Sequence, residues 1–399
     1  MKKLTGNKHL FLLYSAILIL MAISMRSTND MVVTTASPFA KYLLHFSYIL
    51  SALVTAIVYL GTVLATAFLN PLMNSKLRRK VFIFANLIII IMLILYYLSS
   101  NISIFIISFL IGIAYGVILP NIVTSASLYP DKTGRERLLA IYSVGLSFSL
   151  VLGPSLETYL LTFIDYRTVF LFFAPIGIIG FVVSFFMEFP ERNKKEAYGS
   201  SIKYNSGLWI SILTITTYNV PFAALSVFLV IFSETTFHVS SYMAYLPFVF
   251  FFAVSLLMRI YLSIRPIKNI RYPLIIAPAI TIIALIIFPF LPNYFAFVGV
   301  MMLLGIPHGS IFPLSTIEIS RGTTVGERNA VNSYFYSYNM GLFMVIPLIF
   351  AAIVSYIGFE KTFAILIIPV IVSVLIIIKK YWKDDKIFGV KVQKSLQKT

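Results

Sequence analysis

Cysteine is absent from this 399-residue sequence, and charged residues are scarce. The absence of thiols excludes disulfide bonds and thiolate metal sites. Only 11% of the residues are charged, less than half of the ~25% that a soluble domain carries. A composition this poor in charge excludes an ordinary soluble protein.

The motifs of common enzymes are also missing. The sequence has no HExxH zinc motif, no GxxxxGK[ST] phosphate-binding loop and no GxSxG nucleophile motif. Because it also lacks a sizeable soluble domain, an ATP-driven pump is not expected. The sequence therefore predicts no catalytic activity, no bound cofactor and no metal ion.

Long apolar runs are what the sequence has instead. Hydrophobic residues make up 59% of it, and runs of about 20 residues, enough for a helix to cross a bilayer, recur from end to end. This pattern predicts an all-α membrane protein with twelve transmembrane helices. The expected spans are 10–37, 46–69, 81–99, 102–125, 138–161, 168–187, 207–232, 241–263, 272–291, 294–317, 329–355 and 362–378.

Basic residues are distributed unevenly among the connections between these spans. If the N-terminus is cytoplasmic, all but four of the 31 Lys and Arg residues fall on the cytoplasmic side. The exceptions are Lys41, Arg167 and Lys361 in the outer loops, and Arg26 within the first span. Short cytoplasmic loops are rich in Lys and Arg, so we expect a multi-pass protein of the cell membrane with both termini inside. The net charge of +17 then reflects topology and does not indicate nucleic-acid binding.

The two halves of the sequence repeat each other. GIAYGVILP, which begins at Gly112, matches GIPHGSIFP, which begins at Gly305, at an offset of 193 residues. Both halves run from inside to inside through six spans, so the repeat is parallel. We expect two six-helix bundles, a polar loop between them, and a basic tail that anchors at the anionic inner membrane surface. The expected parts are 1–187, 188–206, 207–380 and 381–399.

Several stretches resemble the major facilitator superfamily, specifically its twelve-helix drug–proton antiporter branch. The loop NPLMNSKLRRK at 70–80 is similar to the family's G-x-L-a-D-r-x-G-R-R loop, chiefly in its basic end. GLSFSLVLGPSLET at 145–158 is similar to the antiporter signature g-x-x-x-G-P-x-x-G-G, with Glu157 at a glycine position. NDMVVTTASP at 29–38 is similar to the family's D-x-T-i-V-n-v-A-L-P, whereas Ser108 stands where the family has an arginine in span 4.

The resemblance implies a secondary active transporter that works as a monomer by alternating access. It also implies that spans 1, 4, 7 and 10 line the substrate path between the bundles. The expected partners are a small-molecule substrate, protons and the lipid bilayer. We expect efflux of amphipathic compounds because the path-lining spans are largely apolar and aromatic. The alternatives are uptake of a small organic anion or metabolite, and a non-transporting receptor or scaffold that keeps the fold.

Arg26 and Asp30 are the two charges within the first span. Four residues apart on a helix, they share a face and can pair. Each would cost about 2.5–3.5 kcal/mol at a lipid-facing helix centre. We therefore expect a cavity site, in which Arg26 binds an anionic group and Asp30 binds a proton or cation, or a neutral pair that locks two helices. In span 7, the repeat mate of span 1, Tyr218 and Asn219 beside Pro221 are either further cavity residues or polar groups that join helices.

Other candidates are polar groups elsewhere at membrane depth. Glu157 is either a buried, protonated relay carboxyl or a solvated residue at the outer rim. His308 either titrates or makes a structural hydrogen bond, and Glu318 is expected to pair with Arg321 near the inner end of span 10. The remaining candidates, on one face of span 11, are Asn332, Tyr336 and Asn339, a stripe that either faces the cavity or only packs between helices. The other gating or latch candidates are Arg78, Arg79, Arg135 and Glu136. The loop 134–137 either latches the inner face or is a solvated loop that enforces the topology.

Overall fold

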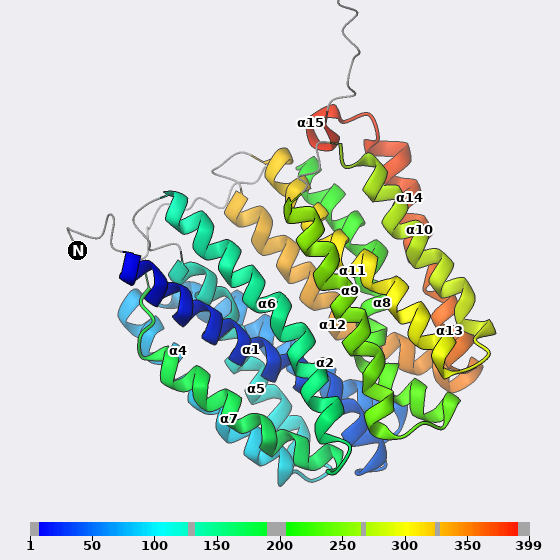
Figure 1. Cartoon of the computed structure of the whole chain (residues 1–399), viewed down its shortest axis with the longest axis horizontal. Helices are drawn as coiled ribbons and strands as arrows, with labels where there is room; N and C mark the ends of the chain where they lie inside the picture. Colours follow the sequence, from blue (N-terminus) through cyan, green and yellow to red (C-terminus); the bar gives the residue numbers. More distant parts are fainter. Residues whose placement is uncertain (1–7, 127–131, 190–204, 265–268, 324–327, 390–399) are drawn as a thin grey trace, which may run out of the picture. The chain divides into compact units, whose positions relative to one another are not determined.

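The computed structural model describes residues 8–126, 132–189, 205–264, 269–323 and 328–389, and all regular structure in these ranges is helical. Figure 1 shows the helices in sequence colours. The α-helices are α1 (Lys8–Tyr42), α2 (Tyr48–Leu64), α3 (Asn70–Leu72), α4 (Ser75–Tyr97), α5 (Ser103–Ala126), α6 (Lys132–Leu160), α7 (Tyr166–Ser184), α8 (Ser206–Phe237), α9 (Ser241–Ile264), α10 (Arg271–Ile287), α11 (Tyr294–Gly322), α12 (Arg328–Ile357), α13 (Phe359–Ile365), α14 (Ile367–Ile376) and α15 (Asp385–Phe388). Short π or 3₁₀ turns extend α2 (Ala65–Leu69), α10 (Phe288–Phe290) and α14 (Ile377–Tyr381).

The helices correspond to the expected spans. Within the described ranges, eleven are long and apolar enough to cross a membrane. The remaining expected span, 138–161, lies in α6, a helix of 29 residues. The all-α membrane fold is therefore confirmed.

Helix ends differ from the hydrophobic boundaries by several residues. α4 begins at Ser75, six residues before the expected start, because the basic segment SKLRRK is itself helical and the Asn74 side chain caps it by accepting a hydrogen bond from the Leu77 amide. α1 continues to Tyr42 despite Pro38. Hydropathy locates the part of a helix that lies in lipid, whereas capping and turn chemistry decide where the helix ends.

The chain divides into two compact units whose borders fall inside helices. The first unit consists of Met1–Lys194, Ala224–Val249 and Phe343–Ser355, and the second of Lys195–Ala223, Phe250–Leu342 and Tyr356–Thr399. Segments of α8, α9 and α12 thus belong to the same unit as the N-terminal helices. The borders in α8 and α9 each fall two residues after a proline, Pro221 and Pro247. The six-and-six division of the sequence stays a prediction.

The sequence repeat reappears as a repeat of helix contacts inside each unit. In the first unit, Gly112 of α5 lies so close to α2 that an added Cβ would stand 2.1 Å from the Val58 carbonyl oxygen. In the second unit, Gly305 of α11 meets the Phe251 carbonyl oxygen of α9 in the same way, at 2.5 Å. Gly112 corresponds to Gly305 and Val58 corresponds to Phe251, both at the offset of 193 residues. Small residues permit this close approach of membrane helices.

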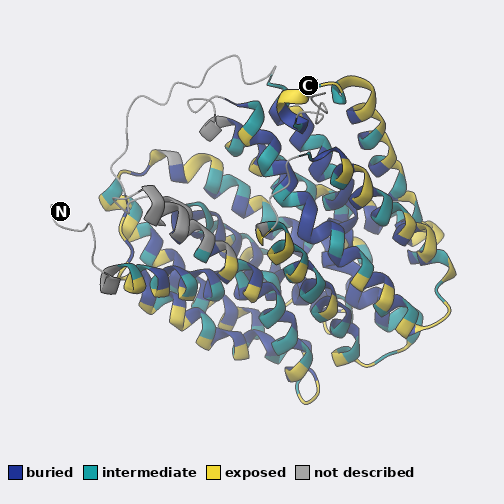
Figure 2. Cartoon of the chain, turned by 45° about the horizontal axis from the view of Figure 1, so that its top comes forward, coloured by how far each residue is buried: buried dark blue, intermediate teal, exposed yellow. Residues whose placement is uncertain are grey.

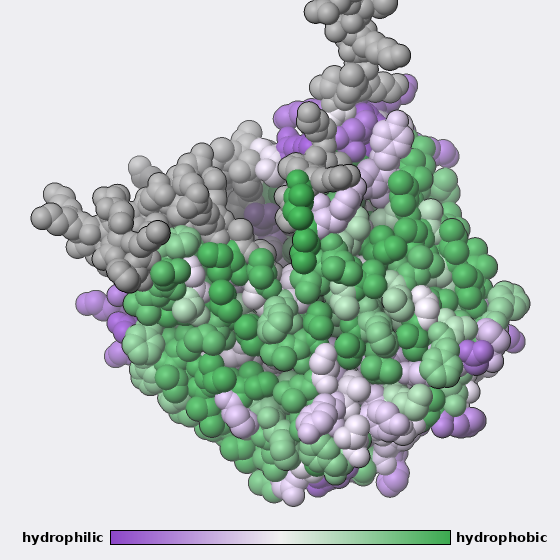
Figure 3. All heavy atoms as spheres, in the orientation of Figure 1, coloured by the Kyte–Doolittle hydropathy of each residue, from purple (hydrophilic) through white to green (hydrophobic). Residues whose placement is uncertain are grey.

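Apolar side chains cover the exposed faces of the helices. Most long helices carry buried residues on one side and exposed ones on another, whereas α8 is buried over most of its length (Figure 2). On α4 the exposed residues include Phe84, Ile91 and Ile94, and on α14 they include Ile368 and Leu375. The space-filling view shows the same apolar cover on the visible face (Figure 3). Exposed apolar surface this extensive is unfavourable in water and fits contact with lipid.

Candidate functional site

The charged pair of the first span forms a salt bridge. Arg26 Nε lies 3.0 Å from Asp30 Oδ2 on α1, and the two side chains are 30% and 12% exposed. Their pairing follows directly from the spacing of one helical turn. Because both side chains are partly exposed, the pair is not fully buried.

Two tyrosines stand next to this pair. Tyr59 of α2 is near enough to interact electrostatically with both Arg26 and Asp30, and Tyr115 of α5 with Asp30. The Tyr59 ring stacks on Phe343 with centroids 5.3 Å apart. The pair is therefore surrounded by polar and aromatic groups from neighbouring helices.

Glu157 is buried beside the same helix. Its side chain on α6 is 0% exposed, and its Oε1 accepts hydrogen bonds from the hydroxyls of Thr34 (2.8 Å) and Thr35 (2.7 Å) on α1. Its Oε2 has no hydrogen-bond partner within the described part of the chain. Glu157 thus lies in a closed environment, which contradicts ordinary solvation at the outer rim, and its role as a proton relay stays a prediction.

A third helix joins this group through a tyrosine. The buried Tyr245 hydroxyl of α9 donates to Thr35 Oγ1 or to the Thr34 carbonyl oxygen, both 3.0 Å away. Thr35 in turn donates to Glu157. Hydrogen bonds therefore run from α9 through α1 to a buried carboxyl on α6. Networks of this kind respond as a unit when one member changes its protonation.

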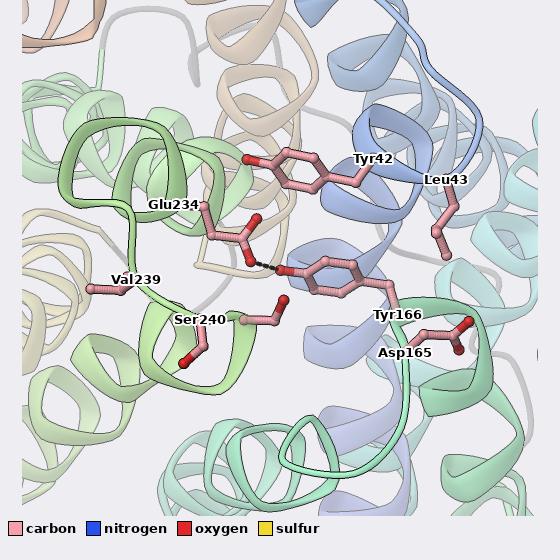
Figure 4. Close-up of a pocket in the computed structure, with 8 residues that line it drawn as sticks. Tyr42, Leu43, Asp165, Tyr166, Glu234, Val239 and Ser240 are labelled. Carbon is pink, nitrogen blue, oxygen red and sulfur yellow. Dashed lines mark hydrogen bonds between the residues drawn. The ribbon is translucent and has the colours of Figure 1, made fainter.

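The network continues into a cluster of tyrosines, which we define as Tyr42, Tyr166 and Tyr245. The Tyr166 ring lies 6.2 Å from that of Tyr245 and stacks on Tyr42 at 6.0 Å. The Tyr166 hydroxyl of α7 donates a short hydrogen bond to Glu234 of α8 (Figure 4). A cavity of about 430 Å³ opens here, lined by Tyr42, Leu43, Asp165, Tyr166, Glu234, Val239, Ser240 and Ser241.

In the second unit, only some of the candidate residues on α8 and α12 are in contact. Asn219 Nδ2 donates to Asn339 Oδ1 at 2.8 Å, and Asn339 is 3% exposed. Tyr336, expected on the same face, is 47% exposed, and Asn332 is half-buried. The structure therefore brings Asn219 and Asn339 together, whereas the expected stripe does not share one environment.

His308 lies in an aromatic box within the second unit. Its Nδ1 is 2.7 Å from Ser255 Oγ, and its side chain is 8% exposed. Four rings surround the imidazole at centroid distances of 4.6–5.4 Å: Tyr218, Phe222, Phe251 and Phe252. Tyr218 and His308 thus belong to one packed cluster.

Glu318 and Arg321 do not form the expected ion pair. Glu318 is 0% exposed and accepts a hydrogen bond from the Thr214 hydroxyl of α8 at 3.0 Å, while Arg321 donates to the Ile387 carbonyl oxygen at 3.0 Å. No salt bridge between them is found within 4.0 Å, although both side chains are described. The prediction failed because a spacing of three residues allows pairing but does not outweigh partners on other helices.

The gating candidates Arg78 and Arg79 lie on α4 and hydrogen-bond to backbone carbonyl groups. Arg78 donates to the carbonyl oxygens of Asn70 and Met73, and Arg79 donates to that of Phe185 at the end of α7. These contacts satisfy carbonyl groups at helix ends. The side chains of Arg135 and Glu136, on α6, lie outside the described residues.

Thr34, Thr35, Tyr245 and Glu234 were not predicted from the sequence. Threonine and tyrosine are common in this chain, and their contacts join residues more than one hundred positions apart. Glu234 carried a usable signal, because it is an acidic residue only two positions beyond the expected span 207–232.

Comparison with known proteins agrees with this architecture. A bacterial homologue of the human lysosomal transporter Spinster, inward-facing and occupied, superposes with a TM-score of 0.71 at 13% identity, over 93% of this chain and 96% of that one. A D-xylose–proton symporter superposes with a TM-score of 0.71 at 12% identity, over 96% of this chain and 99% of that one. A POT family transporter in complex with 5-aminolevulinic acid superposes with a TM-score of 0.73 at 12% identity, over 91% of this chain and 95% of that one. At these identities the likeness shows the fold.

A match in sequence identifies the family. No curated protein matches the chain. The family model for the Major Facilitator Superfamily, however, matches residues 16–340, which is most of the sequence. The chain therefore belongs to the Major Facilitator Superfamily, a family of membrane transporters.

Proposed function

We propose that the chain is a proton-coupled secondary transporter that moves a small solute by alternating access. We place it in the cell membrane as a monomer, with both termini in the cytoplasm, as the distribution of Lys and Arg favours. The two six-helix bundles of the sequence are proposed to be the moving halves. On this orientation the tyrosine cluster lies at the outer end.

The buried carboxyl of Glu157 is the observation that carries the proposal. A carboxylate at membrane depth is costly unless it is paired. Glu157 receives two threonine hydroxyls and has no cation within hydrogen-bond distance among the described residues. Such a group holds a proton while buried and gives it up when water reaches it. Asp30, by contrast, is neutralised by Arg26, so we assign proton binding to Glu157 first and to Asp30 second.

The link from Glu157 to Tyr245 supports coupling of this proton to motion. Glu157 and Thr35 belong to the N-terminal half of the sequence, whereas Tyr245 and Glu234 belong to the C-terminal half. Tyr245 to Thr35 and Tyr166 to Glu234 are contacts between these halves at the end proposed to be outer. Opening that end breaks both contacts. A change in the charge of Glu157 would therefore alter the stability of the closed outer end.

We favour efflux of amphipathic compounds as the direction and substrate class. Aromatic rings are frequent near the candidate groups, including Tyr59 and Tyr115 beside the α1 pair and the box around His308. Aromatic and apolar linings bind amphipathic ligands with few specific polar contacts. Asp30 and Glu157 provide acidic groups for proton exchange.

Arg26 favours a second candidate function, the uptake of a small organic anion or metabolite. Its salt bridge to Asp30 uses Nε, and a guanidinium has four further N–H donors. If this function is correct, Arg26→Gln should weaken anion binding about tenfold or more, since hydrogen bonds to charged groups contribute about 1.5–3 kcal/mol. The measurement is the dependence of uptake into proteoliposomes on the anion concentration, with Lys76→Gln, which removes an exposed positive charge at the start of α4, as the control.

A pH-gradient assay tests the proposed function. Purified protein is reconstituted into liposomes, and movement of fluorescent amphipathic cations and of labelled organic anions is measured with and without an imposed pH gradient. Accumulation that follows the gradient supports proton coupling, and the class of compound that moves decides between the two candidates. Absence of any gradient-dependent or exchange movement across the panel contradicts a transporter and favours a receptor or scaffold.

A further inference from the structure

The segment after the last membrane span, which we call the strap (residues 382–389), is attached to the second unit by many hydrogen bonds. Arg271, at the start of α10, is the centre of these contacts and is 7% exposed. It donates to the carbonyl oxygens of Trp382 (3.1 and 3.2 Å) and Gly389 (2.9 Å), and it pairs with Asp385 at 2.5 Å. A buried arginine with all these partners holds a defined geometry.

The strap also closes the ends of two further helices. Arg321 of α11 donates to the Ile387 carbonyl oxygen at 3.0 Å. Ile387 and Phe388 are 0% exposed and pack with Ile210 of α8 in one apolar cluster. At the same place Gly207 and Gly322 bring α8 and α11 into close backbone contact. The inward side of the strap therefore joins the ends of α8, α10 and α11.

The outward side of this region is basic. Lys379, Lys380, Lys383 and Lys386 are all exposed. The two acidic residues nearby are engaged on the strap itself, since Asp384 accepts a hydrogen bond from the Ile387 amide and Asp385 pairs with Arg271. Hydrophilic residues gather at α15 in the space-filling view (Figure 3). The Asp385 side chain is itself 60% exposed, but four exposed lysines outnumber the two acidic residues, so the net charge of this side is positive.

The position of these lysines identifies the partner. The span Phe359–Tyr381 leads directly into the strap, so the four lysines lie at the boundary between membrane and water. Tyr381 and Trp382 are half-buried at the same level, where aromatic side chains favour the interface. A cluster of lysines next to a membrane helix attracts anionic lipid.

We propose that anionic lipid headgroups bind Lys379, Lys380, Lys383 and Lys386 and thereby hold the strap against the ends of α8, α10 and α11. The lipid acts on the outward side, and Arg271 and Arg321 transmit its effect on the inward side. Bound lipid stabilises the strap in its docked position. The strap belongs to the second unit, whereas Glu157, Arg26 and Asp30 belong to the first, and the proposal does not depend on the transported substrate.

Cysteine labelling tests this proposal, because the native chain has no cysteine. Ile387→Cys places a thiol on the buried side of the strap. The protein is reconstituted in phosphatidylcholine vesicles with or without phosphatidylglycerol and labelled with an uncharged maleimide. Labelling should be about tenfold slower with phosphatidylglycerol, since each lysine near an anionic surface adds substantially to binding. Replacing the four lysines with glutamine should remove this difference.

A matched variant and a second readout complete the test. Lys76→Gln with Lys80→Gln, both exposed at the start of α4, should keep the full lipid effect. Hydrogen exchange of the strap amides in the unsubstituted chain should slow with phosphatidylglycerol in the same way. Equal labelling and equal exchange in both vesicles, or a lipid effect that survives loss of the four lysines, would overturn the proposal.

Discussion

Glu157→Gln should abolish transport driven by a pH gradient while leaving exchange of substrate across a membrane without a gradient. Glutamine keeps the size of the side chain, and its carbonyl oxygen can accept the hydrogen bonds from Thr34 and Thr35. It cannot bind or release a proton. The closed arrangement should therefore form normally, whereas the proton gradient should no longer drive movement.

The size of this effect follows from the strength of coupling between two binding events. Coupling free energies of about 1–3 kcal/mol correspond to changes of about 5–150-fold, so gradient-driven accumulation should fall at least about tenfold. The measurements are accumulation with a gradient and counterflow without one. Glu188→Gln, an exposed carboxyl after α7, is the control and should behave like the unsubstituted chain. Gradient-driven accumulation that survives Glu157→Gln would refute the role of this residue.

Gly112→Ala should cause the largest loss of stability among single-methyl changes in the α2–α5 contact. The added Cβ would lie 2.1 Å from the Val58 carbonyl oxygen, and backbone atoms cannot move aside as a flexible side chain can. Overpacking of this kind costs about 1–3 kcal/mol. We expect a lower thermal unfolding temperature in detergent, with the same effect for the repeat mate Gly305→Ala.

A glycine in open surroundings gives the matched comparison. Gly299 lies on α11 and would have no atom within 4 Å of an added Cβ. Gly299→Ala should be neutral or stabilising by about 0.4–1 kcal/mol, because alanine restricts the unfolded chain. If Gly112→Ala and Gly299→Ala unfold at the same temperature, close backbone packing between α2 and α5 is not what stabilises this contact.

The features predicted from the sequence are those that depend on nearby residues. Apolar runs predicted the spans, because each must cover the thickness of a bilayer. The pairing of Arg26 with Asp30 follows from one turn of helix. The repeat at Gly112 and Gly305 predicted equivalent positions, and both proved to be close helix contacts.

The features missed from the sequence depend on helices brought together by the fold. Glu157 was recognised as unusual, but its threonine partners lie 122 and 123 positions away, and the tyrosine that bonds to those threonines lies 210 and 211 positions from them. Glu318 and Arg321 have the spacing of a pair, yet each contacts a different segment. Arg271 lies one residue before the expected span 272–291, where a basic residue is ordinary, yet it is buried at the centre of the strap contacts. Spacing on one helix cannot rank such partners.

Ser37 offers a probe for the proposed link between Glu157 and the outer end. It lies one turn beyond Thr34 on α1 and is 0% exposed, and its hydroxyl has no hydrogen-bond partner within the described part of the chain. Ser37→Cys is therefore a small change that reacts only when this region opens. The titratable groups that interact with Glu157 are Asp30 on α1 and Tyr245 on α9, and Tyr245 also interacts with Glu234 on α8.

The most direct measurement is the pH dependence of maleimide labelling of Ser37→Cys, corrected for thiol reactivity, with and without Glu157→Gln. A neutral Glu157 is compatible with the closed hydrogen-bonded arrangement, whereas its charged form is costly there. Labelling should therefore rise as the pH rises, and Glu157→Gln should remove this dependence. Labelling that does not change with pH, or that changes equally in the Glu157→Gln background, would contradict the proposed coupling of this carboxyl to the outer gate.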